Sequence, residues 1–351
     1  MLLELLYDLG LETRTVHVLL GVTVGLIFGV AAQVSRFCLR RAVAGNPDER
    51  KSAAGVWMTA LAIAILTVQG LSVAGFADLS EHRWLSADLP LAALIVGGLL
   101  FGAGMVLARG CASRLTVLWA SGNLRALSVL IIFAITAHAM LKGVLAPVRE
   151  FIGSPNVTAP VASLADLPGG AAVWAALTGL ILLAFAARSG ARWLHLALGA
   201  VIGLVVAVGW AATTVLLMDE FDPLPTQSIA FTLPWTETLF WTVASTAIPA
   251  SFGTGFIGGV LGGAFTSALL RGELRLESFE SPGQTLRYSA GGLLMGAGGV
   301  LAGGCTVGAG LAGGATLSVA ALVALIAIVA GASGTAAALA QTGFQGARAS
   351  A

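Results

Sequence analysis

The sequence predicts an all-α polytopic membrane protein with about nine transmembrane helices, four short re-entrant half-helices and an inverted internal repeat. Three observations predict this class. The 351 residues are 57% hydrophobic and 10% charged, whereas soluble domains carry about 25% charged residues. Apolar runs long enough to cross a hydrocarbon core of about 30 Å recur along the chain. A glycine-rich motif also occurs four times along the chain.

The repeated motif is a Gly-x-x-x-Gly pair followed, nine residues after its second glycine, by a cysteine. It is clearest in 97–111 and 291–305, and a looser copy spans 25–38. A fourth copy, 199–212, has Ala212 at the cysteine position. The chain has three cysteines, and all lie at this position: Cys38, Cys111 and Cys305. A single intramembrane cysteine is often only a small buried hydrophobic residue, but three in one register indicate a shared use.

The apolar runs predict nine spanning segments: 16–35, 52–75, 90–109, 124–145, 171–188, 192–210, 236–270, 285–303 and 316–341. The seventh is too long for one straight crossing, so we expect Pro249, followed by Gly253 and Gly255, to break or kink it. Four short apolar pieces begin near the motif's cysteine position: 36–45, 110–121, 211–218 and 304–314. These pieces are too short to span. We therefore expect re-entrant half-helices, covered by protein or lining a watery cavity.

The distribution of positive charge predicts the orientation. Arginine and lysine gather in the connections 40–51, 188–192 and 271–287. By the positive-inside rule, this places the N-terminus outside and the C-terminus in the cytoplasm. The first two motif copies then run inward and the last two run outward.

The same topology divides one transmembrane domain, 1–351, into two inverted halves. The halves are about 16–145 and 192–341, and segment 171–188 links them. Inverted halves are typical of transporters, whose site lies near the bilayer midplane where broken helices meet. The glycine pairs predict close helix packing, since small residues let transmembrane helices approach each other.

The start of each half-helix is the candidate site. A helix that begins at the cysteine presents unpaired N–H groups and the positive end of its dipole, which favour an anion. Thiols are weak, soft donors and suit a sulfur-bearing anion. Arg36 and Arg109, each two residues before a cysteine, either attract the anion or anchor the inner face. The candidate contact or entrance residues are Arg36, Arg109, Gly110, Ser113, Gly304 and Thr306.

Other polar and aromatic residues in the apolar segments have simpler expected roles. Gln69 and His138 lie in apolar helices. Each is a functional candidate, or equally a hydrogen-bonding group between helices. Trp84, Trp119 and Trp235, near segment ends, are expected to anchor the protein at the membrane interface.

Several function classes are disfavoured. The net charge of +1 argues against nucleic acid as a partner. The sequence has no C-x-x-C pair of the kind that binds metals, and no G-x-x-x-x-G-K-[ST] motif of the kind that binds ATP. We therefore expect no cofactor and no catalytic residue. The first 15 residues carry the wrong charges for a cleaved secretory signal.

Three segments resemble the cysteine motifs of the YeeE/YedE family of bacterial inner-membrane thiosulfate transporters: Ser35-Arg-Phe-Cys38, Ala108-Arg-Gly-Cys-Ala-Ser113 and Ala302-Gly-Gly-Cys-Thr-Val-Gly-Ala-Gly310. The resemblance covers nearly the whole chain. It implies an hourglass of nine spanning and four short helices. Cys38, Cys111 and Cys305 would line its narrow centre and pass thiosulfate inward through S–H···S hydrogen bonds, with Cys111 the most sensitive. It also implies a separate TusA-like sulfurtransferase as a partner on the cytoplasmic side.

Other readings remain open at this stage. Some relatives handle selenium or other sulfur species, so another sulfur or selenium species is an alternative substrate. A membrane thiol oxidoreductase would need neighbouring cysteines that form a disulfide. A passive anion or small-solute channel could also be built from half-helices.

Overall fold

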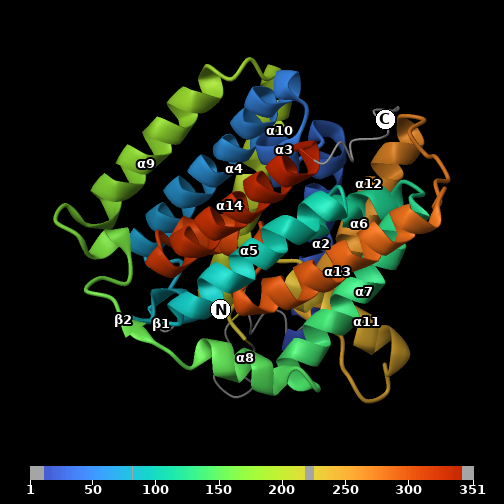
Figure 1. Cartoon of the computed structure of the whole chain (residues 1–351). Helices are drawn as coiled ribbons and strands as arrows, with labels where there is room; N and C mark the ends of the chain where they lie inside the picture. Colours follow the sequence, from blue (N-terminus) through green and yellow to red (C-terminus); the bar gives the residue numbers. More distant parts are fainter. Residues whose placement is uncertain (1–11, 81, 218–224, 342–351) are drawn as a thin grey trace.

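Long helices form where the apolar runs were predicted. The computed structural model describes residues 12–80, 82–217 and 225–341, and among these residues nine helices have 17 residues or more. They are α2 (Thr13–Ser35), α4 (Pro47–Val73), α5 (Leu91–Leu107), α7 (Leu124–Lys142), α9 (Gly170–Ala187), α10 (Trp193–Ala211), α12 (Phe252–Leu270), α13 (Pro282–Leu301) and α14 (Val319–Gln341). Figure 1 shows them packed as one bundle, with α9 at its edge beside α4. Most of the first 15 residues, assessed above for a secretory signal, lie outside the described part.

Local signals fix several helix starts. The side chain of Asn123 accepts a hydrogen bond from the Ala126 N–H at 2.9 Å and caps α7. Ser281 caps α13 in the same way, and Pro282 follows at the first helical position, where its missing N–H costs nothing. In these two helices, a polar capping residue marks where the apolar segment begins.

The membrane-protein class is confirmed. Eight helices of the described chain are long and apolar enough to cross a membrane. The eighth predicted segment, 285–303, coincides with α13, which is not among those eight helices and carries Gln284 and Arg287 in its first turns. It packs between α5 and α7 within the bundle.

The seventh predicted segment is interrupted, as expected. It forms α11 (Thr232–Val243) and α12, and the break between them contains Pro249. The two glycines expected to contribute to the break lie inside α12 instead. Gly255 serves close packing, because a Cβ there would lie 2.2 Å from the Val18 carbonyl oxygen of α2.

Three of the four predicted half-helices are separate short elements. The first is α3 (Leu39–Ala44), and the second is α6 (Ala112–Ala120). The third combines a π-helical turn, Gly308–Gly313, with a 3-10 turn, Gly314–Thr316.

The fourth predicted half-helix is wrong as a separate element. Ala212–Leu216 is a π-helical continuation of α10, and Ala211 keeps right-handed helical angles. Residues 210–212 are Trp-Ala-Ala, and the high helix propensity of alanine favours continuation of the helix. Residue 218, the last of that predicted piece, lies outside the described residues.

The motif glycines bring parallel helices into contact. A Cβ at Gly25 of α2 would lie 2.3 Å from the Phe256 carbonyl oxygen of α12, and one at Gly29 would lie 2.4 Å from that of Val260. The other copies pack in the same way, with glycine pairs against main-chain oxygens of a parallel partner: Gly98 and Gly102 of α5 on α14, Gly199 and Gly203 of α10 on α4, and Gly292 and Gly296 of α13 on α7. The close packing predicted for these glycines is confirmed.

The equivalent helices α5 and α13 cross in opposite directions. Gly97, near the start of α5, lies against Ala302 just after α13, whereas Gly104 lies against Gly291 in the first half of α13. Because these helices carry the second and third motif copies, the copies are inverted relative to each other. Each of the four glycine contacts joins a helix of 16–145 to a helix of 192–341, and the contacts correspond in twos: α2 with α12 matches α10 with α4, and α5 with α14 matches α13 with α7.

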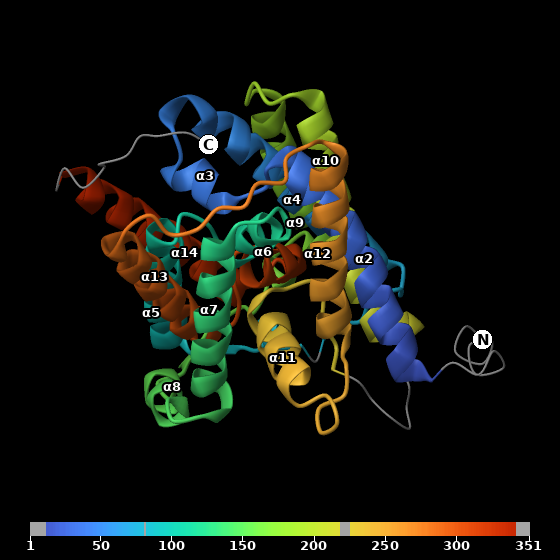
Figure 2. The same cartoon turned by 90° about the vertical axis from the view of Figure 1, so that its right-hand side faces the viewer.

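The two ends of the bundle carry different connections. At one end lie α8 (Ala146–Gly153) and a small antiparallel ladder of β1 (Asp88–Leu89) with β2 (Val157–Thr158). At the other end lie α3 and the connection between α12 and α13 (Figure 2).

Candidate functional site

The same backbone break precedes all three cysteines. Arg36, Arg109 and Gly303, each two residues before a cysteine, adopt left-handed backbone angles with φ of 52°, 57° and 72°. Left-handed angles are uncommon for residues other than glycine and cost about 1–2 kcal/mol. Their recurrence in one register shows that the motif ends one helix and redirects the chain.

After the break, each cysteine opens a short helical segment. Cys38 is the residue that precedes the first turn of α3, and Cys111 occupies the same position before α6. The N–H groups of a first helical turn lack intrahelical partners. Cys305 precedes the third short segment, and the Gly308 N–H donates to its Sγ at 3.4 Å. The prediction that half-helices begin at the cysteines is confirmed for these three copies.

The fold brings two of the thiols into contact. Cys38 Sγ and Cys111 Sγ lie 3.9 Å apart, although 73 residues separate them in the chain. Cys111 Sγ also lies 3.2 Å from Ser113 Oγ, in the first turn of α6. Both thiols are buried, with exposed fractions of 4% and 1%. Two thiols and a hydroxyl thus form one buried polar cluster, which we call the thiol pair with Ser113.

Cys305 is fully buried in the same core. Within the part of the chain that the structure describes, no hydrogen bond joins its Sγ to either of the other thiols. A row of phenylalanines connects the two regions: Phe37, beside Cys38, contacts Phe28, which contacts Phe231. Ala230, next to Phe231, lies against Gly308 on the third short segment.

The remaining candidates divide into surface and core positions. Arg36 and Arg109 are exposed, whereas Gly110, Ser113, Gly304 and Thr306 are buried. A Cβ at Gly304 would lie 2.7 Å from the Ala309 main-chain nitrogen, so the third segment requires a glycine there.

Arg114 is a residue that the sequence analysis did not select for the site. It lies in the first turn of α6 with a half-buried side chain, and its Nη1 is enclosed without a hydrogen-bond partner. Its electrostatic neighbours include both Cys38 and Cys111. The signal that could have identified it is its place three residues after a motif cysteine, on the half-helix itself.

Gln69 and His138 each contact a neighbouring element. Gln69 Nε2 of α4 donates to the Ala315 carbonyl oxygen of the third segment at 2.9 Å, so it bonds a neighbouring element within the core. His138 of α7 stacks on Phe240 of α11 with ring centroids 3.8 Å apart.

The expectation that Trp84 and Trp235 are interface anchors is wrong. Both are buried, with exposed fractions of 5% and 4%. The Trp235 indole N–H of α11 donates to Thr116 Oγ1 of α6 at 2.8 Å. Trp84 packs against Gly303 and Gly313 of the third segment. Indole rings supply a large apolar area and one N–H donor, which suits them to hold irregular segments within a core.

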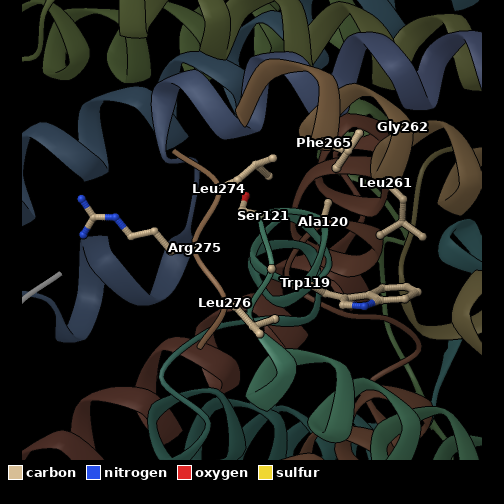
Figure 3. A pocket seen from close by; sticks show the side chains of 10 residues that line it. Trp119, Ala120, Ser121, Leu261, Gly262, Phe265, Leu274, Arg275 and Leu276 are labelled. Carbon is tan, nitrogen blue, oxygen red and sulfur yellow. The ribbon is translucent and has the colours of Figure 1, made fainter. Parts of the chain in front are cut away.

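A surface hollow lies at the far end of α6 from Cys111. It has a volume of about 650 Å³ and an apolar lining: Trp119, Ala120, Ser121, Gly122, Leu261, Gly262, Phe265, Leu274, Arg275 and Leu276. Figure 3 shows the Arg275 side chain directed away from the apolar side chains around the hollow. None of the three cysteines lines it.

Comparison with known proteins gives a consistent result. A family model described as "Sulphur transport" matches residues 34–333, a range that includes all three cysteines. A thiosulfate transporter TsuA of Spirochaeta thermophila is 27% identical over 314 residues, which cover 82% of this chain and 88% of the relative. A thiosulfate transporter TsuA of Escherichia coli K12 is 25% identical over 320 residues, which cover 84% and 86%.

Proposed function

Since the chain belongs to the sulphur transport family, we propose that it is a membrane transporter that takes up thiosulfate along a central path lined by Cys38, Cys111 and Cys305. The relatives named above as thiosulfate transporters support this substrate. The observation that carries the proposal is the contact of two motif thiols, 3.9 Å apart, at the starts of two half-helices.

The chemistry of the thiol pair with Ser113 suits this anion. An anion that leaves water loses a large hydration energy, which only converging donors can offset. The first turns of α3 and α6 offer N–H groups and positive dipole ends. Thiosulfate has a terminal sulfur besides three oxygens, so thiols can serve the sulfur while N–H and O–H groups serve the oxygens.

Arg114 supplies the positive charge in this proposal. An enclosed guanidinium nitrogen without a partner is unfavourable, and a passing divalent anion would provide the missing acceptor. We expect Arg114→Gln to raise the KM for thiosulfate about 10- to 100-fold, the factor that corresponds to one charged hydrogen bond, and Arg114→Lys to raise it less. Uptake of labelled thiosulfate into whole cells measures both variants.

Arg275→Gln is the matched control for Arg114, because it removes an arginine that points away from the hollow at the far end of α6 (Figure 3). We expect it to leave the KM for thiosulfate unchanged. Equal effects of the two substitutions would show that Arg114 acts only through the overall surface charge.

We propose the bacterial inner membrane as the location, with the N-terminus outside and the C-terminus in the cytoplasm. The basic connections support this orientation, because α3 and the link from α12 to α13 share one end of the bundle (Figure 2). In this arrangement 16–145 and 192–341 act as inverted halves of one domain, linked by 171–188. A separate TusA-like sulfurtransferase would receive the sulfur on the cytoplasmic side.

A second function is favoured by the same contact. A membrane thiol oxidoreductase needs two neighbouring cysteines, and Cys38 and Cys111 satisfy this requirement. The two functions differ in what happens to the thiols during each cycle. A transporter accumulates labelled thiosulfate with its thiols reduced, whereas an oxidoreductase loses two thiols in each catalytic cycle and regains them.

Growth on defined sulfur sources tests the transport proposal. A sulfur-starved host that lacks its own thiosulfate uptake should grow on thiosulfate only when it carries this chain. Sulfate, sulfite and selenite are tested in parallel to define the substrate class. Growth on thiosulfate that is no better than with an empty vector would contradict the proposal.

A further inference from the structure

We propose that Cys38 and Cys111 form a reversible disulfide that closes the transport path under oxidising conditions, while Cys305 remains a thiol. The closure of the path rests on the proposed function, whereas the pairing does not. Their Sγ atoms lie 3.9 Å apart, and a disulfide bond is about 2.05 Å long. The two sulfurs therefore need to approach by only about 2 Å. Cys305 makes its sulfur contact with the Gly308 N–H instead.

The surrounding backbone allows this approach. Each thiol lies at the beginning of a short element, since α3 has 6 residues and α6 has 9. A left-handed residue, Arg36 or Arg109, precedes each of them and separates the short element from its long helix. A small shift of α3 toward α6 is therefore not resisted by a continuous helix.

Burial limits which oxidants can act. Both thiols are nearly inaccessible, so a bulky protein oxidant cannot reach them. A small uncharged molecule can reach a buried thiol when the short elements around it open locally. Diamide, an azodicarboxamide, is such an oxidant.

The reaction with diamide balances. The sulfur of one cysteine adds to the N=N bond, and the sulfur of the other then displaces the nitrogen. One S–S bond forms and two S–H bonds break. The two electrons and both protons reduce the azo group to a hydrazine, and a dithiol reductant such as dithiothreitol reverses the change.

The disulfide has two consequences for transport. It removes two of the soft donors of the path, and it fastens α3 to α6 at the thiol pair. Thiosulfate uptake should therefore stop on oxidation and return on reduction.

Counting free thiols on the purified, full-length protein tests the pairing without relying on transport. The protein is treated with diamide, denatured and labelled with a maleimide, and the adducts are counted by mass. The wild type has three free cysteines, so we expect three adducts before oxidation, one after it and three after dithiothreitol. The Cys305→Ser variant should fall from two adducts to none, and Cys38→Ser should keep its two.

The outcomes separate this inference from the proposed function. Three adducts after diamide, or a disulfide peptide that contains Cys305, would overturn the pairing. One adduct with undiminished uptake in liposomes would overturn the closure of the path. A protein that forms the Cys38–Cys111 peptide but never transports thiosulfate would instead contradict the proposed function.

Discussion

Cys111→Ala is expected to lower thiosulfate uptake about 10- to 100-fold, whereas Cys111→Ser should retain a measurable part of the uptake. Cys111 is the thiol that contacts both Cys38 Sγ, at 3.9 Å, and Ser113 Oγ, at 3.2 Å. Alanine removes the donor, and the loss of one hydrogen bond to a charged group corresponds to about 1.5–3 kcal/mol. Serine keeps a donor at nearly the same place. Initial rates of labelled thiosulfate uptake, divided by the amount of protein in the membrane, give the comparison.

The amount of inserted protein controls for folding in this series. Each side chain is small and the site is buried, so both variants should reach the membrane in wild-type amounts. Wild-type uptake by the alanine variant would remove the thiol from the mechanism. Equal loss in both variants would mean that sulfur itself, and not only a donor, is required.

Gly259→Ala is expected to destabilise the bundle strongly, while Gly258→Ala should not. A Cβ at Gly259 of α12 would lie 2.2 Å from the Val22 carbonyl oxygen and 2.9 Å from the Leu26 main-chain nitrogen of α2. Main-chain atoms cannot rotate away, so the two helices must separate. Overpacking of this kind costs about 1–3 kcal/mol or more. We expect the Tm in detergent to fall by about 1–4 °C.

Gly258 provides a matched control in the same helix. A Cβ there would have no atom of another element within 4 Å. Both substitutions give α12 the same gain in helix propensity, up to about 1 kcal/mol, so the difference between them isolates the contact with α2. Thermal stability that is equal in the two variants would contradict the close approach of α2 and α12.

Much of the candidate site could be predicted because its signal is local. The left-handed Arg36, Arg109 and Gly303 lie where the motif placed the start of each half-helix. Residue type and spacing carry this information without reference to the rest of the fold. Arg114 was not selected because an arginine near a membrane surface is usually an anchor. Its proximity to both Cys38 and Cys111 is visible only in the structure.

The fourth motif copy and the tryptophans show where local patterns failed. Ala212 occupies the cysteine position of the repeat, yet α10 continues through it as a π-helical turn. Trp84 and Trp235 lie near segment ends, as interface residues do, but their side chains turn into the bundle. A hydropathy profile indicates how near a residue lies to the end of a membrane span. It does not indicate whether the side chain contacts lipid or a neighbouring helix.

The sequence alone determined the membrane class, most of the spans and three of the four helix breaks at the motif, since each depends on residues close together in the chain. Only the tertiary structure decided that α2 lies along α12, that α5 crosses α13 in the opposite direction, and that Cys38 meets Cys111. These contacts join residues far apart in the chain. Which helices pack against each other depends on how closely their backbones can approach at the glycines, and this is decided only in the packed bundle.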